Sequence, residues 1–225
     1  MSIDSRLSEI ARLVDRRRRD PYAGYGRIGD YHQGIFECDY VSPYSKSAHN
    51  LDANVMVFLQ DWSSHERLLL PPDPEVVRLG YTPSLPTNRN LISLLRTHLG
   101  LELRDTYSTN LFPFIKLGNL SAGIPFTALV RAGQEFALPQ LSAIRPRLAI
   151  CLGLATFNAL RVATGHAAVP NLASALEAPF EVGPTRVVCQ AHTGNLGRNG
   201  RNKGGIDRVS ADWKALGRWL EGVRV

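Results

Sequence analysis

The chain has 225 residues, and 44% of them are hydrophobic, which is enough for one sizeable folded core. It carries 26 Lys and Arg against 20 Asp and Glu, and the net charge of +6 favours polyanionic partners such as nucleic acid. The three cysteines, Cys38, Cys151 and Cys189, are odd in number and far apart, which argues against a disulfide framework and a four-cysteine metal or iron-sulfur site. No run approaches the length of a membrane span, and no apolar signal core opens the chain. We therefore expect one domain over residues 1–225, in a cytoplasmic setting, with no membrane contact.

An amphipathic helix is predicted at residues 3–19, because apolar side chains recur there at helical spacing. These positions are Ile3, Leu7, Ile10, Leu13 and Val14. Four consecutive arginines, residues 16–19, end the pattern before Asp20 and Pro21. Phosphate contact is one interpretation of the arginines, but a solvated last turn that complements the helix dipole is the favoured one. Residues 22–50 show no clear period, so we expect an irregular arm that leads into the sheet.

Four segments rich in β-branched and large apolar residues are predicted to be strands, and helical patterns separate them. The strands are expected at residues 55–59, 107–111, 147–153 and 186–191. The helices are expected at residues 91–99, 125–138, 155–162 and 206–220, with a loop over residues 71–88. Strands that alternate with helices predict an α/β fold, namely a three-layer α/β/α sandwich with a central, mainly parallel four-stranded sheet. Residues 1–50 then form the helix and arm, and residues 51–225 form the α/β core.

Polar side chains follow three of the predicted strands. Asp61, Asn110 and His192 each stand at or just beyond the carboxyl end of a strand, where open α/β sheets bind ligands. We therefore expect one crevice to hold all three. Each residue also has a simpler interpretation: Asp61 as a helix cap, Asn110 as a turn residue, His192 as a hydrogen-bonded structural histidine.

Several short motifs lie in a familiar order. Gln60-Asp61-Trp62-Ser63 is similar to a Gln-Asp-Pro-Tyr motif, and His192-Thr193-Gly194-Asn195-Leu196 is similar to a His-Pro-Ser-Pro-Leu motif. Between them lie Thr109-Asn110-Leu111 and the run from Arg145 to Gly153, which resembles a Pro-to-Leu-Gly strand. Over residues 54–220 the chain thus resembles the uracil-DNA glycosylase superfamily, as a divergent member without an iron-sulfur cluster.

The resemblance implies a role for each residue of the base pocket. Asp61 would orient or activate the attacking water, and His192 would donate a hydrogen bond to the base oxygen as the glycosidic bond breaks. Asn110 would pair with the edge of the flipped base through its amide donor and acceptor. Tyr81 would stack on the base, although an aromatic side chain at such a position is more often part of the core. Gln60 and Ser63 would also contact the substrate.

A second set of residues would contact the DNA. Leu196 would fill the emptied base stack, and the segment around Thr87 and Asn88 would contact phosphate. Residues 192–205 are rich in glycine and basic residues, and we expect a loop that wraps the DNA backbone through Arg198, Arg201 and Lys203. A flexible solvated loop is the rival interpretation.

Ser63 departs from the superfamily pattern. It replaces a tyrosine that packs against the base and excludes substituents at the pyrimidine 5 position, so the pocket is expected to be more permissive. We hypothesise that 5-substituted uracils, or deaminated purines such as hypoxanthine and xanthine, are accepted. Trp62 in place of proline is a second departure, and it leaves the conformation of this loop open.

The resemblance predicts a monofunctional DNA glycosylase that removes uracil or a related base and leaves an abasic site. It implies no cofactor and no metal, and its partner is DNA with a damaged base. Two alternatives stay open: a protein of the same fold that binds damaged DNA without turnover, and an α/β enzyme that acts on nucleosides or nucleotides. The sequence does not predict the oligomeric state.

Overall fold

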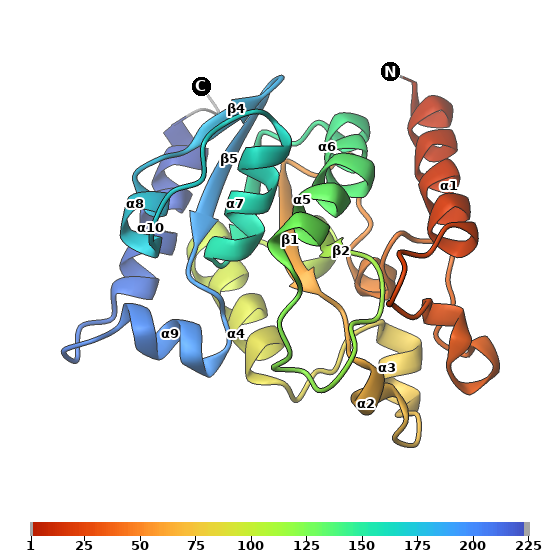
Figure 1. The fold of residues 1–225 in the computed structure, drawn as a ribbon. Coiled ribbons are helices and arrows are strands. Elements are labelled where there is room, and N and C mark those ends of the chain that lie inside the picture. Colours follow the sequence, from red (N-terminus) through yellow and green to blue (C-terminus); the bar gives the residue numbers. More distant parts are fainter. Residues whose placement is uncertain (1, 223–225) are drawn as a thin grey trace.

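The computed structural model describes residues 2–222, and its centre is a five-stranded mixed sheet that is mostly parallel. The strands are β1 Val55–Asp61, β2 Tyr107–Phe112, β3 Leu148–Leu152, β4 Phe180–Val182 and β5 Thr185–Gln190. They lie in the order β2-β1-β3-β5-β4, and only β4 is antiparallel to its neighbour. The carboxyl ends of the four parallel strands therefore share one edge, which is the lower edge in Figure 1.

The expected α/β fold is present, but the expected four-stranded sheet is wrong by one strand. β4 is only three residues long and pairs with β5 through a tight turn at Gly183 and Pro184. Three residues between Pro179 and Gly183 are too few to show a strand period, which explains why the sequence pattern missed this edge strand.

Alternate residues of β1 pack in two hydrophobic clusters, one on each face of the sheet. Met56 and Phe58 pack in a cluster with the helices on one face, whereas Val55, Val57 and Leu59 pack in a cluster on the other. Since successive side chains of a strand point to opposite faces, a continuous apolar run is what a strand buried on both sides requires. Helices therefore cover both faces of the sheet (Figure 1).

One face carries α1 Ile3–Arg19, α5 Phe126–Ala132, α6 Leu138–Ile144 and α7 Leu154–Ala163. The other carries α4 Pro86–Leu94, a π-helical turn Leu95–Leu99 and α10 Arg208–Gly222. A second π-helical turn, Gly133–Ala137, joins α5 to α6. Four short helices are α2 His65–Leu68, α3 Pro74–Leu79, α8 Leu172–Leu176 and α9 Asn195–Arg201. No helix among residues 2–222 has the length and apolar content to cross a membrane.

The predicted helices are confirmed with shifted ends. The helix expected at 91–99 begins earlier, at Pro86, because proline suits a first helical position. The helix expected at 125–138 continues through the second π-helical turn to Ile144. The expectation of a loop throughout residues 192–205 is wrong, because α9 occupies half of it. Glycines at 197 and 200 hid this helix from the sequence pattern.

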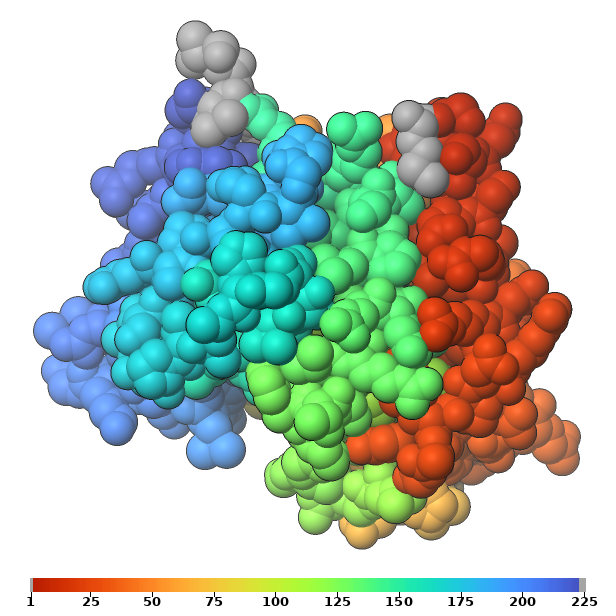
Figure 2. All heavy atoms as spheres, turned by 45° about the horizontal axis from the view of Figure 1, so that its top comes forward, coloured from red at the N-terminus to blue at the C-terminus, as the bar shows by residue number. Residues whose placement is uncertain are grey.

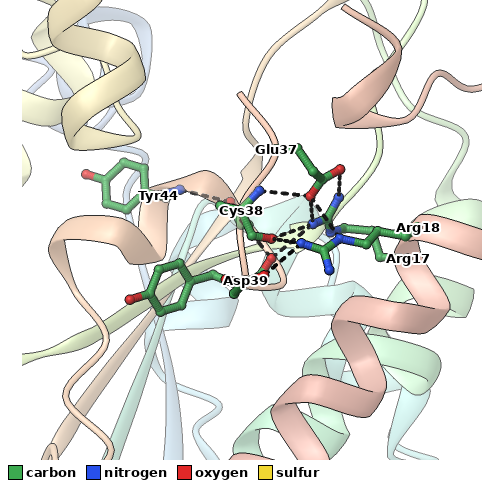
Figure 3. A network of polar contacts seen from close by, with 8 residues as sticks. Arg17, Arg18, Glu37, Cys38, Asp39 and Tyr44 are labelled. Atoms are coloured by element: carbon green, nitrogen blue, oxygen red, sulfur yellow. Dashed lines mark hydrogen bonds and ion pairs between the residues drawn. The ribbon is translucent and has the colours of Figure 1, made fainter. Parts of the chain in front are cut away.

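The arm between α1 and β1 contains three 3-10 turns, Ile28–Asp30, His32–Gly34 and Pro43–Ser47, and a fourth, Leu103–Asp105, precedes β2. The expectation that the four arginines form a solvated last turn is wrong. Arg17 is 0% exposed, and its guanidinium donates to the Glu37 carboxylate and to the carbonyls of Cys38 and Tyr40 (Figure 3).

The other three arginines are ion-paired as well, but only Arg19 remains mostly exposed, as the prediction expected. Arg18 pairs with Glu37 and Asp39 of the arm, and Arg19 pairs with Asp15 one turn earlier. Arg16 pairs with Glu135, at 2.9 Å. Figure 2 shows the N-terminal segment lying along the flank of the segment that carries α5 and α6. The arginines therefore tie α1 to the arm and to the core.

Candidate functional site

A cavity of ≈ 260 Å³ opens at the carboxyl edge of the sheet. Its walls come from β1, β2, α3, α4, the arm and the segment after β5. Eight residues that the sequence singled out line it: Gln60, Asp61, Ser63, Tyr81, Thr87, Asn88, Asn110 and His192. Gln60 and His192, which are 132 positions apart in the chain, line the same cavity. They meet because parallel strands end at the same edge of the sheet.

Asp61 closes β1 and forms a buried ion pair. Its Oδ2 lies 2.9 Å from Nζ of Lys116, and its side chain is only 12% exposed. Gln60 donates to the other oxygen, Oδ1, at 3.3 Å. Burial raises the pKa of the Asp61 carboxyl, and the Lys116 ammonium and His192 oppose this rise. The cavity thus contains a carboxylate that is desolvated yet held next to a cation.

Lys116 is a site residue that the sequence analysis missed. It follows the apolar run Phe112-Pro113-Phe114-Ile115, in which a lysine is unexpected, and this contrast was the available signal. Its ammonium also donates to the Leu120 carbonyl at 2.6 Å. The pair with Asp61 and this carbonyl together compensate the burial of the charge.

Replacing Lys116 by methionine is expected to raise the pKa of Asp61 further, because the opposing cation is removed while the burial remains. An NMR titration of the Asp61 carboxyl carbon measures this pKa directly. Lys46→Met is the matched control, since Lys46 is also part-buried on a carbonyl, that of Val77, and does not pair with Asp61. An unchanged Asp61 midpoint in Lys116→Met would contradict the electrostatic role.

His192 follows β5 and presents a neutral imidazole. The backbone N–H of Gly194 donates to its Nδ1 at 3.1 Å, so the ring proton of the neutral form sits on Nε2. Burial lowers the pKa of His192 and Lys116 lowers it too, while Asp61 raises it. Gly194 and Gly197 both press against this histidine, and a Cβ on Gly197 would lie 2.2 Å from the His192 carbonyl oxygen. The geometry leaves Nε2–H as a hydrogen-bond donor.

Asn110 lies in β2 and is fully buried. Its Oδ1 accepts a hydrogen bond from the Ser42 hydroxyl at 2.5 Å. Its Nδ2 is buried without a hydrogen-bond partner, although the residue lines the cavity. An unpaired buried donor costs folding free energy, so a ligand oxygen is the natural partner for this amide.

Aromatic side chains form one wall of the cavity. Tyr81 packs on Tyr44 with ring centroids 5.4 Å apart, and both line the cavity. Trp62 donates from Nε1 to the Gly80 carbonyl at 2.8 Å and packs edge-on against Phe36. Gly80 has φ +79°, and a Cβ there would lie 1.8 Å from the Pro43 carbonyl oxygen, so the close approach of the arm requires glycine.

The predicted DNA-contacting residues lie in two places: two of them at the cavity, and the other four, Leu196, Arg198, Arg201 and Lys203, in α9 or just after it. Thr87 and Asn88 line the cavity from the first turn of α4, but the Asn88 amide is satisfied internally by Tyr44 and the Thr82 carbonyl. Leu196 projects from α9 and is 91% exposed. The cavity lining includes none of Leu196, Arg198, Arg201 and Lys203.

The three basic residues of this group differ in their partners. Arg201 holds the Asp212 carboxylate with two hydrogen bonds of 2.7 and 2.8 Å. Arg198 donates to Asn90 at 2.8 Å, and Lys203 has an exposed side chain. The charge of Arg201 is therefore already paired within the protein, whereas the Lys203 side chain is exposed at the surface.

Within residues 2–222, no group of three or more His, Cys, Asp or Glu is arranged to hold a metal ion. No known protein-family model matches the chain, and no curated protein matches it significantly in sequence.

Proposed function

We propose that this protein is a monofunctional DNA glycosylase that hydrolyses the N-glycosidic bond of uracil, or of a related deaminated or 5-substituted base, and leaves an abasic site. One observation carries the proposal: a carboxylate, a neutral imidazole donor and an unpaired amide donor line one small cavity. A cavity of ≈ 260 Å³ lies at the small end of ligand sites, which suits a single nucleobase. The proposal includes the fold class: we interpret the sheet and the helical layers on its two faces as a three-layer α/β/α sandwich.

The chemistry needs opposite electrostatics on the two sides of the bond. As the bond breaks, the sugar gains positive charge and the base gains negative charge. Asp61 would stabilise the sugar and orient the water, while His192 would donate from Nε2 to the base oxygen. A neutral histidine is suited to this role, since it donates without transferring a full proton to the base.

A base inside a duplex is unreachable, so DNA repair by this route requires the base to leave the stack, at a cost of roughly a few kcal/mol. Tyr81 would stack on the extruded base, and Asn110 would bind its edge. Leu196 would fill the gap in the duplex, and α9 would lie near the backbone with Arg198 and Lys203. The net charge of +6 favours such a polyanionic partner.

Ser63 is buried in the cavity wall where the resembling motif has a tyrosine. Its small side chain supports the proposal that bases larger than uracil enter. Trp62, which follows Asp61 in the same motif, also lines the cavity, and its indole is held by the Gly80 carbonyl and by packing on Phe36.

One observation favours a second candidate, a protein that binds damaged DNA without turnover. Each carboxylate oxygen of Asp61 already has one partner, Lys116 on Oδ2 and Gln60 on Oδ1, so only the second lone pair of each oxygen is left for an attacking water. A single experiment distinguishes the candidates: single-turnover incubation with duplexes that each carry one uracil, 5-substituted uracil, hypoxanthine or xanthine, followed by alkali to cleave abasic sites.

A glycosylase yields cleaved strands, with substituted uracil or a deaminated purine among the substrates. Cleavage confined to plain uracil would contradict the interpretation of Ser63. A shifted band in a native gel without cleavage of any duplex would instead support the binding protein.

Leu196→Ala is expected to lower excision from duplex DNA about ten-fold while leaving excision from single strands nearly unchanged, because only the duplex has a stack to fill. The folding stability should change by no more than about 0.5 kcal/mol, since the side chain is 91% exposed. Ile206→Ala is the matched control, as Ile206 is also exposed, at 58%, and follows α9. Equal losses on duplex and single strands would remove Leu196 from the wedge role.

A further inference from the structure

The hydroxyl of Ser42 holds one end of the Asn110 amide and leaves the other end without a partner. Ser42 is fully buried, and its Oγ accepts the backbone N–H of Tyr44 at 3.2 Å. The single hydroxyl proton is then donated to Oδ1 of Asn110 at 2.5 Å. Because Oδ1 is held by this bond, Nδ2 is the end that remains unpaired beside the cavity.

We propose that Ser42 is a specificity-determining residue: by fixing Asn110 as a hydrogen-bond donor, it makes the cavity select bases with an oxo group and reject bases with an amino group. This inference rests on the proposed function. Ser42 lies outside the sequence motifs that led to that function. Uracil, hypoxanthine and xanthine present an oxygen acceptor to the amide, whereas cytosine and adenine present an N–H donor.

An amino group at this position meets the Asn110 amide donor with its own donor. Reversing the amide would bring Oδ1 toward the base and Nδ2 toward the second lone pair of Ser42 Oγ, but the single Ser42 hydroxyl proton would then lose its acceptor in a buried site. A mismatch of this kind is expected to cost about ten- to a hundred-fold in affinity.

The arm that carries Ser42 is anchored by α1. Arg17 and Arg18 bind Glu37, the Cys38 carbonyl and Asp39, a few residues before Ser42 (Figure 3). On the other side of Ser42, the Pro43 carbonyl lies against Gly80. The contacts of Arg17 and Arg18 therefore fix the position of the arm, and the arm contributes to the cavity wall.

The test compares Ser42→Ala with the matched control Ser45→Ala. Ser45 lies in the 3-10 turn that Ser42 caps and is equally buried, but its hydroxyl donates to the Ser108 carbonyl. The measured quantity is the ratio of affinities for duplexes that carry a uracil or a cytosine opposite an abasic site, obtained by fluorescence anisotropy with every variant in the Asp61→Asn background, so that the uracil is not excised during the measurement. Ser42→Ala is expected to lower this ratio about ten-fold or more, and Ser45→Ala is expected to leave it unchanged.

Ser42→Cys covers the case in which the alanine variant fails to fold, because the thiol keeps the shape and donates only weakly. It is expected to give an intermediate ratio. A ratio equal to that of the wild type in the folded Ser42 variants would overturn the inference. Since the readout is binding, it remains decisive even if the wild type releases no base, an outcome that would overturn the proposed catalysis alone.

Discussion

Asp61→Asn is expected to lower the single-turnover rate of base excision roughly a thousand-fold, a loss typical of removing a group that acts on the attacking water. The variant preserves the shape of the side chain but removes the negative charge opposite the developing positive sugar. DNA binding should persist, because the amide and imidazole donors and the exposed Leu196 are unchanged. Rates from quenched-flow sampling and affinities from anisotropy separate the two effects.

The same substitution leaves Lys116 buried without its carboxylate, so a lost fold must be distinguished from lost chemistry. The double variant Asp61→Asn with Lys116→Met removes both charges and is expected to recover thermal stability without recovering activity. Undiminished turnover in a folded Asp61→Asn protein would remove Asp61 from the mechanism.

Arg17→Met is expected to reduce the free energy of unfolding by about 3 to 5 kcal/mol, which is the usual result of breaking a buried ion pair from one side. Arg17 is completely buried and binds Glu37 and the carbonyls of Cys38 and Tyr40, so the variant removes hydrogen bonds from three acceptors at once and leaves Arg18 as the remaining arginine on Glu37 and Cys38. Urea denaturation at neutral pH measures the loss. Arg19→Met is the control, because Arg19 is 77% exposed and its pair with Asp15 is long, at 3.5 Å.

The loss should also depend on pH. Burial raises the pKa of Glu37, but the hydrogen bond and charge of Arg17 outweigh it and hold this pKa below its ordinary value. A lowered carboxyl pKa contributes stability above the unfolded value, and this contribution disappears as the pH falls through the folded value. The difference between wild type and Arg17→Met should therefore shrink in acid. A difference that is small at neutral pH would show that the arginine network does not hold the arm.

The strand-end residues of the site were predictable from the sequence. Asp61 and His192 follow apolar runs, and Asn110 lies within one, so local pattern and the geometry of parallel sheets together placed them at one edge. The alternation of Met56 and Phe58 with Val57 on the two faces of β1 follows from the same local rule.

The remaining parts of the site depend on contacts between distant segments, which a local pattern does not contain. Ser42 bonds to Asn110, which lies 68 residues further along the chain. The arm that carries Ser42 shows no periodic pattern, so its position could not be predicted. Lys116 lies in a loop, and only folding brings it to Asp61. Arg17 looked like a surface charge because its partner, Glu37, lies beyond the end of its own helix.

Mass spectrometry of the reaction products tests the central claim most directly, with purified wild-type protein in excess over a duplex that carries one uracil or hypoxanthine. A monofunctional glycosylase predicts one free base released per duplex and an otherwise intact strand with an abasic site. A bound but unchanged duplex, or release of a nucleoside or nucleotide instead of the free base, would contradict it.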